Sequence, residues 1–554
     1  MKLNNRKLLL IVLFAVFLFL RLFADLPAVL LASDSLKFLN LAKHFPYHTL
    51  GNNQLYLLHA PFYPYLIHFV SLLVREDYLA AIAINFVSAC ITFFVIYRLF
   101  MMLTNDFSKT FISLLFFTLS VDLIIASRKV TRESFVMMLL ISAIYLYVKW
   151  AKHGDKKSIL GASIISGILG ITTDHVVFLL PSFALSYLLL NRKRIILRKL
   201  NFPNLKYAIL PVVFILVFYG FWLGVRNYHY SSSDYYPAGL EGAPIKTKNF
   251  GLTALMNPKY FEGFDLKNAQ PGIIPRLKNV AYIFGYMFNT EPLSIARGLN
   301  LATMKFLLSP WHVAYAVFIY LPLVLATIYG FFLIIRDFFR TRKIYNNVDL
   351  YILLLFLIFL FPITQRAASP RFVYPAYIFL FYVMAHSMIA LSGKIGISGK
   401  NAKTLFVVIV VLLLLLVPVW HYRNNHFVFS AEKYVFSEKT GEFINKNIGK
   451  ADAIMTQPGY TYKLIYLTGN RVISLPENSK DLSFFLKYYN ISYVLFGRFY
   501  TFDKYYYSDD SAQLIKNSPD KFKLIATVKE DYTKFLNPED PASTDEVYIY
   551  KVLN

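Results

Sequence analysis

The chain has 554 residues, of which 57% are hydrophobic and only 16% are charged. A soluble protein carries about 25% charged residues, so this composition excludes an ordinary soluble enzyme. The net charge is +25, but residues 421–554 contribute almost none of it, with 17 basic against 16 acidic residues. The basic excess therefore lies in residues 1–420, where we expect it to set membrane topology and meet anionic lipid; a nucleic-acid partner is not indicated.

Eleven apolar runs are candidates for membrane-spanning helices. They cover residues 8–24, 79–101, 108–126, 134–150, 158–173, 176–190, 206–225, 312–335, 349–364, 371–391 and 403–420. The first run lacks the small-residue cleavage site of a signal peptide, so we expect it to remain as a helix. The sequence thus predicts a polytopic α-helical membrane protein of about eleven transmembrane helices. Its single cysteine, Cys90, excludes an intrachain disulfide.

Short basic loops give the expected orientation, because such loops stay in the cytoplasm. With the N-terminus inside, alternating the runs also places the loops "KHGDKK", "NRKRIILRK", "RDFFRTRK" and "GKIGISGKNAK" inside. The outer side then receives residues 25–78, residues 226–311 and everything after residue 420. We predict an integral membrane protein with a cytoplasmic N-terminus, and the Lys-, Asn-, Tyr- and Ile-rich composition favours a prokaryotic plasma membrane.

The first outer loop contains two stretches that predict helices lying in the membrane interface. Residues 35–45 have apolar side chains at helical spacing, and residues 61–74 are apolar but too short to span a bilayer. Asp34 comes directly before the first of these stretches, where it is also a suitable helix N-cap.

Two outer turns carry cations on the side that topology disfavours. Residues 124–134 read "IIASRKVTRES", with Arg128 and Arg132 one turn apart if the segment is helical. The turn "QRAASPR" likewise carries Arg366 and Arg371. Cations in such places indicate a bound anion, which is either a substrate phosphate or the headgroups of ordinary lipid.

The last part of the chain, residues 421–554, is polar enough to fold in water. A helical stretch near 432–447 is followed by short β-branched runs that alternate with helical ones. We therefore divide the chain into a transmembrane domain, 1–420, and an extracytoplasmic α/β domain, 421–554.

The order of these features resembles the GT-C glycosyltransferases, and within them the branch of protein O-mannosyltransferases and aminoarabinose transferases. The resemblance covers about 420 residues: an inward-starting helix, the acidic residue Asp34 in the first outer loop, and the "APFYP" run at 60–64. It continues with Glu133 after the third apolar run and with Arg371-Phe-Val-Tyr-Pro375 at the tenth. The family implies a sugar donor linked to a polyprenyl phosphate and an acceptor that is a lipid, a glycan or a protein.

The resemblance also implies roles for single residues. Asp34 corresponds to the first-loop catalytic acid, Glu133 to the second-loop acid, and Arg371 to a residue that contacts the carrier phosphate. Further candidates for phosphate binding are Arg128, Arg132, Arg366 and His175, and candidates for lining the active site are His59, Pro61, Tyr63 and Tyr374. Many relatives have a second acid after the first, but this chain has Ser35 there. A metal site within the first loop is therefore unsupported, a divalent metal between Asp34 and Glu133 stays open, and no other cofactor is expected.

These residue types suit transfer of a sugar from a phosphate. Asp34 is the candidate base for an acceptor hydroxyl, and one displacement would invert the anomeric centre. Arginine side chains would stabilise the phosphate leaving group. Structural alternatives remain: Glu133 can pair with Lys129 or favour a helix N-terminus, and Arg371 can reach the lipid interface from a helix end.

Two other functions remain open. One is a flippase for lipid-linked sugars, although the sequence shows no repeated halves and few polar residues within the apolar runs. The other is a catalytically inactive assembly protein with the same fold, which the departure at Ser35 keeps under consideration.

Overall fold

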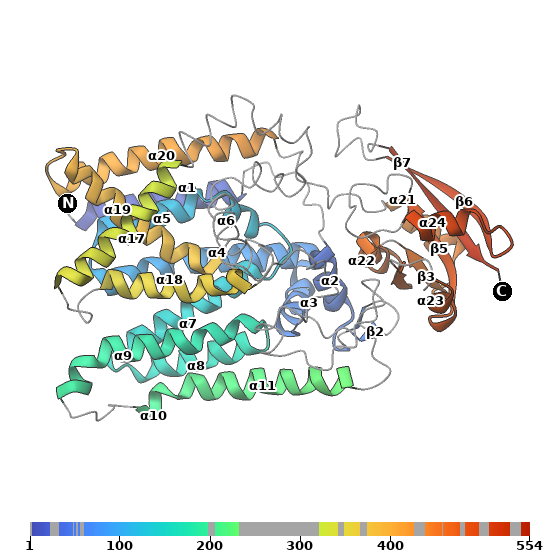
Figure 1. Cartoon of the computed structure of the whole chain (residues 1–554), viewed down its shortest axis with the longest axis horizontal. Helices are drawn as coiled ribbons and strands as arrows, with labels where there is room; N and C mark the ends of the chain where they lie inside the picture. The colour runs from blue at the N-terminus through green and yellow to red at the C-terminus, as the bar shows by residue number, and fades with distance from the viewer. Residues whose placement is uncertain are drawn as a thin grey trace.

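The structure is a computed structural model, and it describes fourteen segments of the chain. They are residues 3–22, 33–47, 49–50, 54–55, 60–197, 205–231, 321–341, 348–365, 374–425, 438–456, 458–476, 482–497, 509–531 and 544–553. A bundle of roughly parallel and antiparallel helices carries an α/β domain at one end, and the N-terminus lies at the opposite end (Figure 1). We call these two the domain end and the amino-terminal end of the bundle.

The bundle is built from long helices that run between its two ends. They are α1 (Leu3–Leu22), α4 (Asp77–Thr104), α5 (Phe107–Leu119), α7 (Glu133–His153), α8 (Lys156–Gly170), α9 (Leu179–Leu197), α11 (Leu210–Ser231), α17 (Leu321–Thr341), α18 (Val348–Gln365), α19 (Tyr374–Lys394) and α20 (Lys400–Asn425). Within the described residues, five segments are long and apolar enough to cross a membrane: 77–104, 133–153, 205–226, 321–340 and 374–394. The predicted helical membrane fold is confirmed; the count of about eleven spans and the boundary at residue 420 stay predictions.

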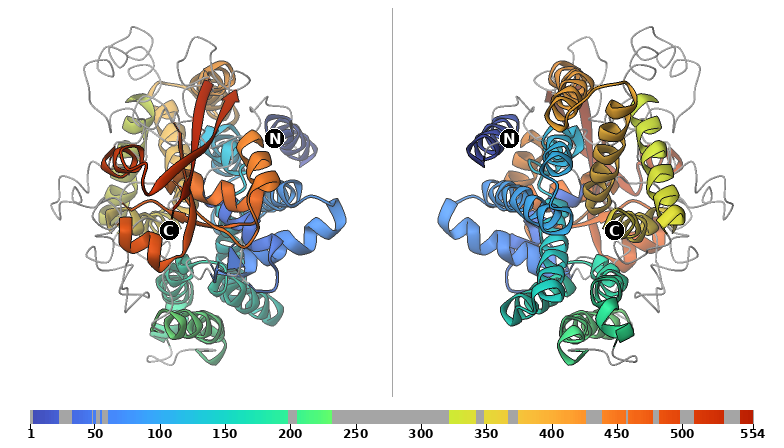
Figure 2. Two further views of the ribbon diagram at one scale, coloured as in Figure 1. Left: turned by 90° about the vertical axis from the view of Figure 1, so that its right-hand side faces the viewer. Right: turned by 90° about the vertical axis from the view of Figure 1, so that its left-hand side faces the viewer.

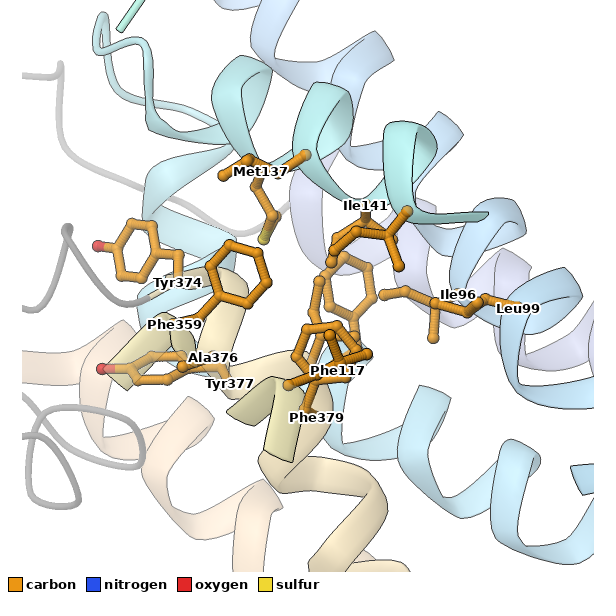
Figure 3. Close-up of a cluster of buried hydrophobic side chains, with 14 of the residues drawn as sticks. Ile96, Leu99, Phe117, Met137, Ile141, Phe359, Tyr374, Ala376, Tyr377 and Phe379 are labelled. Carbon is orange, nitrogen blue, oxygen red and sulfur yellow. The ribbon is translucent and has the colours of Figure 1, made fainter. Parts of the chain in front are cut away.

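The core of the bundle lies where α5, α7, α17 and α18 surround α19. Consecutive residues 376–385 of α19 are all buried, so this helix has no lipid-facing side along that stretch. Aromatic and aliphatic side chains from several helices meet there, among them Phe117, Phe359 and Phe379 (Figure 3).

A close contact brings α8 against α11 at the domain end. A Cβ added to Gly170 would lie 3.0 Å from the backbone nitrogen of Tyr219, so a larger residue would push the two helices apart. This contact fixes the position at which the chain leaves α8. Two short helices occur later in the chain: η1 (Asp174–Phe178) directly before α9, and α10 (Leu205–Ala208) before α11.

The predicted run 108–126 is divided at Ser120 into α5 and the short helix α6 (Val121–Ala126). Residues 127–132 then form turns and bends, so the expectation that Arg128 and Arg132 lie one turn apart on a helix was wrong. The buried amide of Asn85 explains this: it donates to the carbonyl oxygens of Lys129 at 2.6 Å and Thr131 at 2.7 Å, which an α-helix would use internally.

Three short elements lie between the bundle and the C-terminal domain: α2 (Ser33–Lys43), the hairpin of β1 (Thr49–Leu50) and β2 (Gln54–Leu55), and α3 (Phe62–Val74). The helix predicted within residues 35–45 is confirmed as α2, and its place in the membrane interface stays a prediction. Leu36, Phe38, Leu39 and Leu41 are at most 2% exposed, because both faces of this helix are covered by protein. The periodicity that predicted the helix could not show that two apolar faces were in use.

The C-terminal domain, the described residues from 438 on, is a five-stranded sheet of order β4-β3-β5-β7-β6 with helices on both faces. Its elements are α21 (Glu438–Asn447), β3 (Ala453–Thr456), α22 (Pro458–Thr468), β4 (Arg471–Ser474), α23 (Leu482–Tyr488), β5 (Ile491–Gly497), α24 (Asp509–Lys516), β6 (Phe522–Asp531) and β7 (Thr544–Val552). Strand β3 is parallel to β4 and β5, whereas β7 is antiparallel to β5 and β6. Seen from the domain end, the sheet lies in front of the bundle (Figure 2).

Neighbouring residues of each strand point into two separate cores, as the period of a β-strand requires. Ile454, Val472 and Leu495 join one core with α21 and α22, whereas Met455, Ile473 and Val494 join the other with α23 and α24. The first core also includes Leu36 and Leu41 of α2. The sheet therefore buries a piece of the first loop together with its own helices.

Candidate functional site

The predicted site residues that the structure describes lie at or beside the domain end of the bundle. Asp34 is in the first turn of α2, but its side chain is outside the described part of the chain. His59, Arg366 and Arg371 also lie outside the described residues. Tyr374 is the first residue of α19, directly after the segment that contains Arg371.

Tyr63 connects three elements of this region. Its side chain is fully buried, and its hydroxyl donates to the carbonyl oxygen of Thr131 at 3.0 Å. Its ring meets that of Phe38 on α2 edge to face, with centroids 5.2 Å apart. Burial raises the pKa of the Tyr63 hydroxyl, and the negative charge of Glu133 raises this pKa further. Tyr63 therefore remains a neutral hydrogen-bond donor that joins α2, α3 and the 127–132 turn.

The loop before α3 places Pro61 as the N-cap residue of that helix, with no side-chain cap hydrogen bond. The next residue, Phe62, donates its backbone N–H to the carbonyl oxygen of Ile171 at 3.1 Å. Ala60 packs beside Trp222 of α11 in a small separate cluster. The "APFYP" run thus fixes the start of α3 against the turn that follows α8.

Glu133 is the first residue of α7, and its carboxylate is half-buried. Its Oε2 atom is buried and has no hydrogen-bond partner among the described residues. The helix N-terminus itself favours a negative charge there, and this electrostatic effect is the structural alternative to a catalytic role. A buried acceptor without a partner is costly, so the atom is available to a ligand or a cation.

Arg132 precedes Glu133 in the chain, and its side chain contacts the turn after α8 and the helix α2. Its Nη1 donates to the carbonyl oxygen of Thr172 at 3.0 Å, and its guanidinium lies 5.9 Å from the Phe38 ring centroid. Arg128 is half-buried in the same turn. The 127–132 turn thus places Arg132 next to α2, whereas the anion that the sequence predicted for these cations stays a prediction.

The turn after α8 contains His175, which hydrogen-bonds through Nδ1 to the Thr173 hydroxyl at 2.8 Å. The neighbouring Asp174 forms an ion pair with Arg226 of α11, with 3.5 Å between Oδ1 and Nη1. Arg226 is only 2% exposed, and the sequence reasoning missed it. Its signal was a lone arginine directly after the apolar run 206–225.

Asp122 is a second residue that the sequence reasoning missed. This carboxylate of α6 is 4% exposed, accepts a 3.4 Å hydrogen bond from the Tyr377 hydroxyl, and interacts electrostatically with Lys129. The hydroxyl groups of Tyr374 and Tyr377 point to the same side, away from the apolar cluster around Phe379 (Figure 3). The sequence signal for Asp122 was a single acidic residue within an apolar run.

Comparisons with known proteins agree with this arrangement. Residues 58–222, from just before α3 to α11, match a family model described as "Dolichyl-phosphate-mannose-protein mannosyltransferase". The oligosaccharyltransferase of Archaeoglobus fulgidus superimposes with a TM-score of 0.52 at 12% identity, over 88% of this chain and 67% of that one. ArnT of Cupriavidus metallidurans superimposes with a TM-score of 0.52 at 11% identity, over 98% of this chain and 97% of that one. The chain has the GT-C fold. No curated protein matches it by sequence.

The matched part of this GT-C fold contains Tyr63, Arg132, Glu133 and His175, but neither Asp34 nor Arg371. The structure brings the helix of Asp34 next to Tyr63 and Arg132 through the Phe38 ring. Within the described residues, no group of three or more His, Cys, Asp and Glu side chains could hold a metal. The roles of these residues, and a metal between Asp34 and Glu133, remain predictions.

Proposed function

We propose that this protein is a membrane glycosyltransferase that moves a sugar from a polyprenyl-phosphate carrier to an acceptor hydroxyl. The observation that carries the proposal is the arrangement at the domain end of a GT-C fold. There the helix of Asp34, the unpaired carboxylate oxygen of Glu133 and the guanidinium of Arg132 lie around Tyr63 and Phe38. The description of the matching family, which names a dolichyl-phosphate-linked mannose, supports a lipid-linked donor.

The proposed reaction is a single displacement at the anomeric carbon. Asp34 takes the proton of the acceptor hydroxyl, whose oxygen forms the new bond to the sugar. The bond between the anomeric carbon and the phosphate oxygen breaks, and its electron pair leaves with the polyprenyl phosphate. The configuration is inverted, because the acceptor attacks from the face opposite to the leaving group.

The cations of the two outer turns would bind the donor phosphate. Arg132 and Arg128 lie in the 127–132 turn, and Arg366 and Arg371 precede α19. Arginine forms forked, charge-assisted hydrogen bonds with phosphate and keeps its charge at all relevant pH values. His175, oriented by the Thr173 hydroxyl, is the further candidate for this group. The residues proposed to line the active site are His59, Pro61, Tyr63 and Tyr374.

A divalent cation is compatible with Glu133, because the buried Oε2 of this residue has no partner among the described residues. Asp34 would supply a second carboxylate ligand, and oxygen ligands of this kind suit hard cations. When bound, such a cation would neutralise negative charge on the donor phosphate. The activity of the protein before and after chelation would test this part of the proposal.

We further propose that the reaction takes place outside the cytoplasm. The basic loop "KHGDKK", which joins α7 to α8, lies towards the amino-terminal end, opposite the C-terminal domain, and this supports a cytoplasmic N-terminus (Figure 1). The acceptor, a lipid, a glycan or a protein, would then meet the donor at the domain end.

The test is a transfer assay with purified protein, radiolabelled polyprenyl-phosphate sugars and candidate acceptors. We expect Asp34→Asn to lower the rate about 100-fold to 10,000-fold, as removal of a catalytic base does. Asp337→Asn is the matched control, because this carboxylate is exposed on α17, where it pairs with Arg336, and is not among the candidate site residues. Equal rates for wild type and Asp34→Asn would contradict the assignment of the base.

The same preparation separates the other two functions. In sealed vesicles, movement of the lipid-linked sugar across the membrane without transfer would identify a flippase. Binding of the donor with neither transfer nor movement would identify an inactive protein of the same fold.

A further inference from the structure

Helix α2 belongs to two cores at once. Leu36 and Leu41 are buried in the core of the C-terminal domain, whereas Phe38, Leu39 and Ala42 are buried in the core of the bundle. We infer that the C-terminal domain, through α22, positions α2 and with it Asp34 for catalysis without itself touching the substrate. This inference rests on the proposed function in its last step, the role of Asp34.

The partners of α2 in the C-terminal domain are specific side chains on one face of the sheet. Ile444 of α21 and Leu464 and Ile465 of α22 are at most 1% exposed and share a core with Leu36 and Leu41. Within the described residues, α2 thus takes a place beside α21 and α22 on that face. A domain that completes its core with a helix from another domain cannot move away without exposing apolar surface.

Tyr466 extends the same contact towards the bundle. This residue of α22 packs against both cores, and the Lys43 ammonium at the end of α2 lies 5.5 Å from its ring centroid. Burial raises the pKa of the Tyr466 hydroxyl, and the negative charges of Asp77 and Glu76 at the start of α4 raise this pKa further. Helix α22 therefore reaches both α2 and the start of a bundle helix.

Helix α2 depends on these contacts because it is short. It has 11 residues, and an isolated helix of fewer than about 12–15 residues is only marginally stable in water. Its conformation therefore depends on burial of its two faces. Loosening one face would leave the first turn, which carries Asp34, less well fixed, and displacement by about 1 Å can lower a rate about 100-fold.

The experiment compares two truncations in the full-length protein, one on each face of the sheet. Leu464→Ala removes side-chain atoms from the core that includes α2, and Phe485→Ala removes them from the other core, which excludes it. Hydrogen exchange of the backbone amides of α2 is measured first, and then kcat and KM for the donor. Ile465→Val, which removes one methylene group, replaces Leu464→Ala if the latter does not yield folded protein.

We expect Leu464→Ala to speed exchange in α2 at least about tenfold, because cavities of this kind cost more than that factor in stability. We expect kcat to fall about tenfold with a smaller change in KM, since the arginines proposed to bind the donor phosphate are not part of α2, although Arg132 lies near its Phe38. Leu464→Met, which conserves the side-chain volume, should leave both the exchange rate of α2 and kcat close to the wild-type values. Phe485→Ala should leave exchange in α2 unchanged.

Unchanged exchange in α2 for Leu464→Ala, or equal acceleration by Phe485→Ala, would overturn the inference. Faster exchange in α2 with an unchanged kcat would also overturn it, because α2 would then be held by the domain without serving catalysis. The exchange measurement needs no substrate. If wild-type protein transfers no sugar but α2 responds as expected, the proposed function fails while the contact between α2 and the domain stands.

Discussion

At the amino-terminal end of the bundle, the Lys109 ammonium lies 3.2 Å from the carboxylate of Asp349, and the Tyr382 hydroxyl donates to the same group at 2.6 Å. At the domain end, the buried Oε2 of Glu133 has no hydrogen-bond partner among the described residues, and Arg132 donates to a backbone carbonyl. Charges at the first end satisfy one another and join α5, α18 and α19. Charges at the second end are only partly matched: Asp174 pairs with Arg226, whereas the Oε2 atom of Glu133 has no hydrogen-bond partner among the described residues and is available to a ligand.

After Asp34→Asn, the largest effect should come from Glu133→Gln at the domain end. We expect the transfer rate to fall about 100-fold, because the amide cannot supply the negative charge of the carboxylate. Thermal stability in detergent should fall only slightly, since Oε2 has no hydrogen-bond partner among the described residues and only the favourable charge at the helix N-terminus is lost. The paired measurements are the transfer rate and the melting temperature. A loss of stability with normal transfer would mean that Glu133 only caps α7.

The opposite outcome is expected for Asp349→Asn. Removing this charge leaves Lys109 without its counter-ion in a partly buried site, at a cost of about 2 kcal/mol, less than the cost for a fully buried pair. The transfer rate per folded molecule should not change, because the site is at the other end. Thermal unfolding and an active-site titration would check this. The comparison of the two ends breaks down if Asp349→Asn lowers the transfer rate of folded protein.

Tyr63→Phe should have a smaller effect. It tests whether transfer requires the 127–132 turn at the domain end to be held in place. Loss of the hydrogen bond from Tyr63 to the Thr131 carbonyl should cost about 1 kcal/mol, because Asn85 still donates to that carbonyl. We expect a severalfold lower transfer rate, since the turn that carries Arg132 is then less firmly fixed. Tyr65→Phe is the matched control on the same helix, as its hydroxyl donates to the Pro46 carbonyl. Equal loss of activity in both variants would show that the effect is not specific to the turn.

The smallest effect concerns Glu530, a buried carboxylate of the C-terminal domain. Its Oε1 accepts hydrogen bonds from the backbone and hydroxyl of Thr440, yet burial raises the pKa of this carboxyl above its usual range. The folded state therefore binds the proton more tightly than the unfolded state. Stability should be greatest below the ordinary glutamate pKa and should fall as the pH rises through the raised value. Glu530→Gln should remove this dependence, as measured by unfolding between pH 4 and pH 8, roughly the range in which such a group titrates.

Periodicity and charge predicted much of the fold. The apolar run 134–150 became α7, the short run 61–74 became α3, and the alternation after residue 438 became strands and helices of one sheet. Each of these predictions depends on residues close together in the chain, whose pattern is set by one helix or one strand. The same local information placed Glu133 at the start of a helix.

Other features depend on contacts that the local pattern does not contain. The non-helical 127–132 turn depends on Asn85, whose bonding partners Lys129 and Thr131 lie 44 and 46 positions away in the chain. Arg226 and Asp122 were single charges near the ends of apolar runs, where snorkelling to the interface is the ordinary reading. Only the folded chain brings Asp174 next to Arg226 and Tyr377 next to Asp122.

The burial of α2 in both the bundle core and the core of the C-terminal domain also has a consequence for the biosynthesis of the protein. Leu41 emerges from the ribosome early, whereas its partners Ile444 and Leu464 follow roughly 400 residues later, so this contact is among the most non-local in the chain. The C-terminal domain can complete its core only after the membrane segments between them have been inserted with the correct alternation. An error in threading would leave that core open to solvent and visible to proteases and chaperones. Completion of the C-terminal domain thus provides a check on the topology of the membrane segments between α2 and this domain.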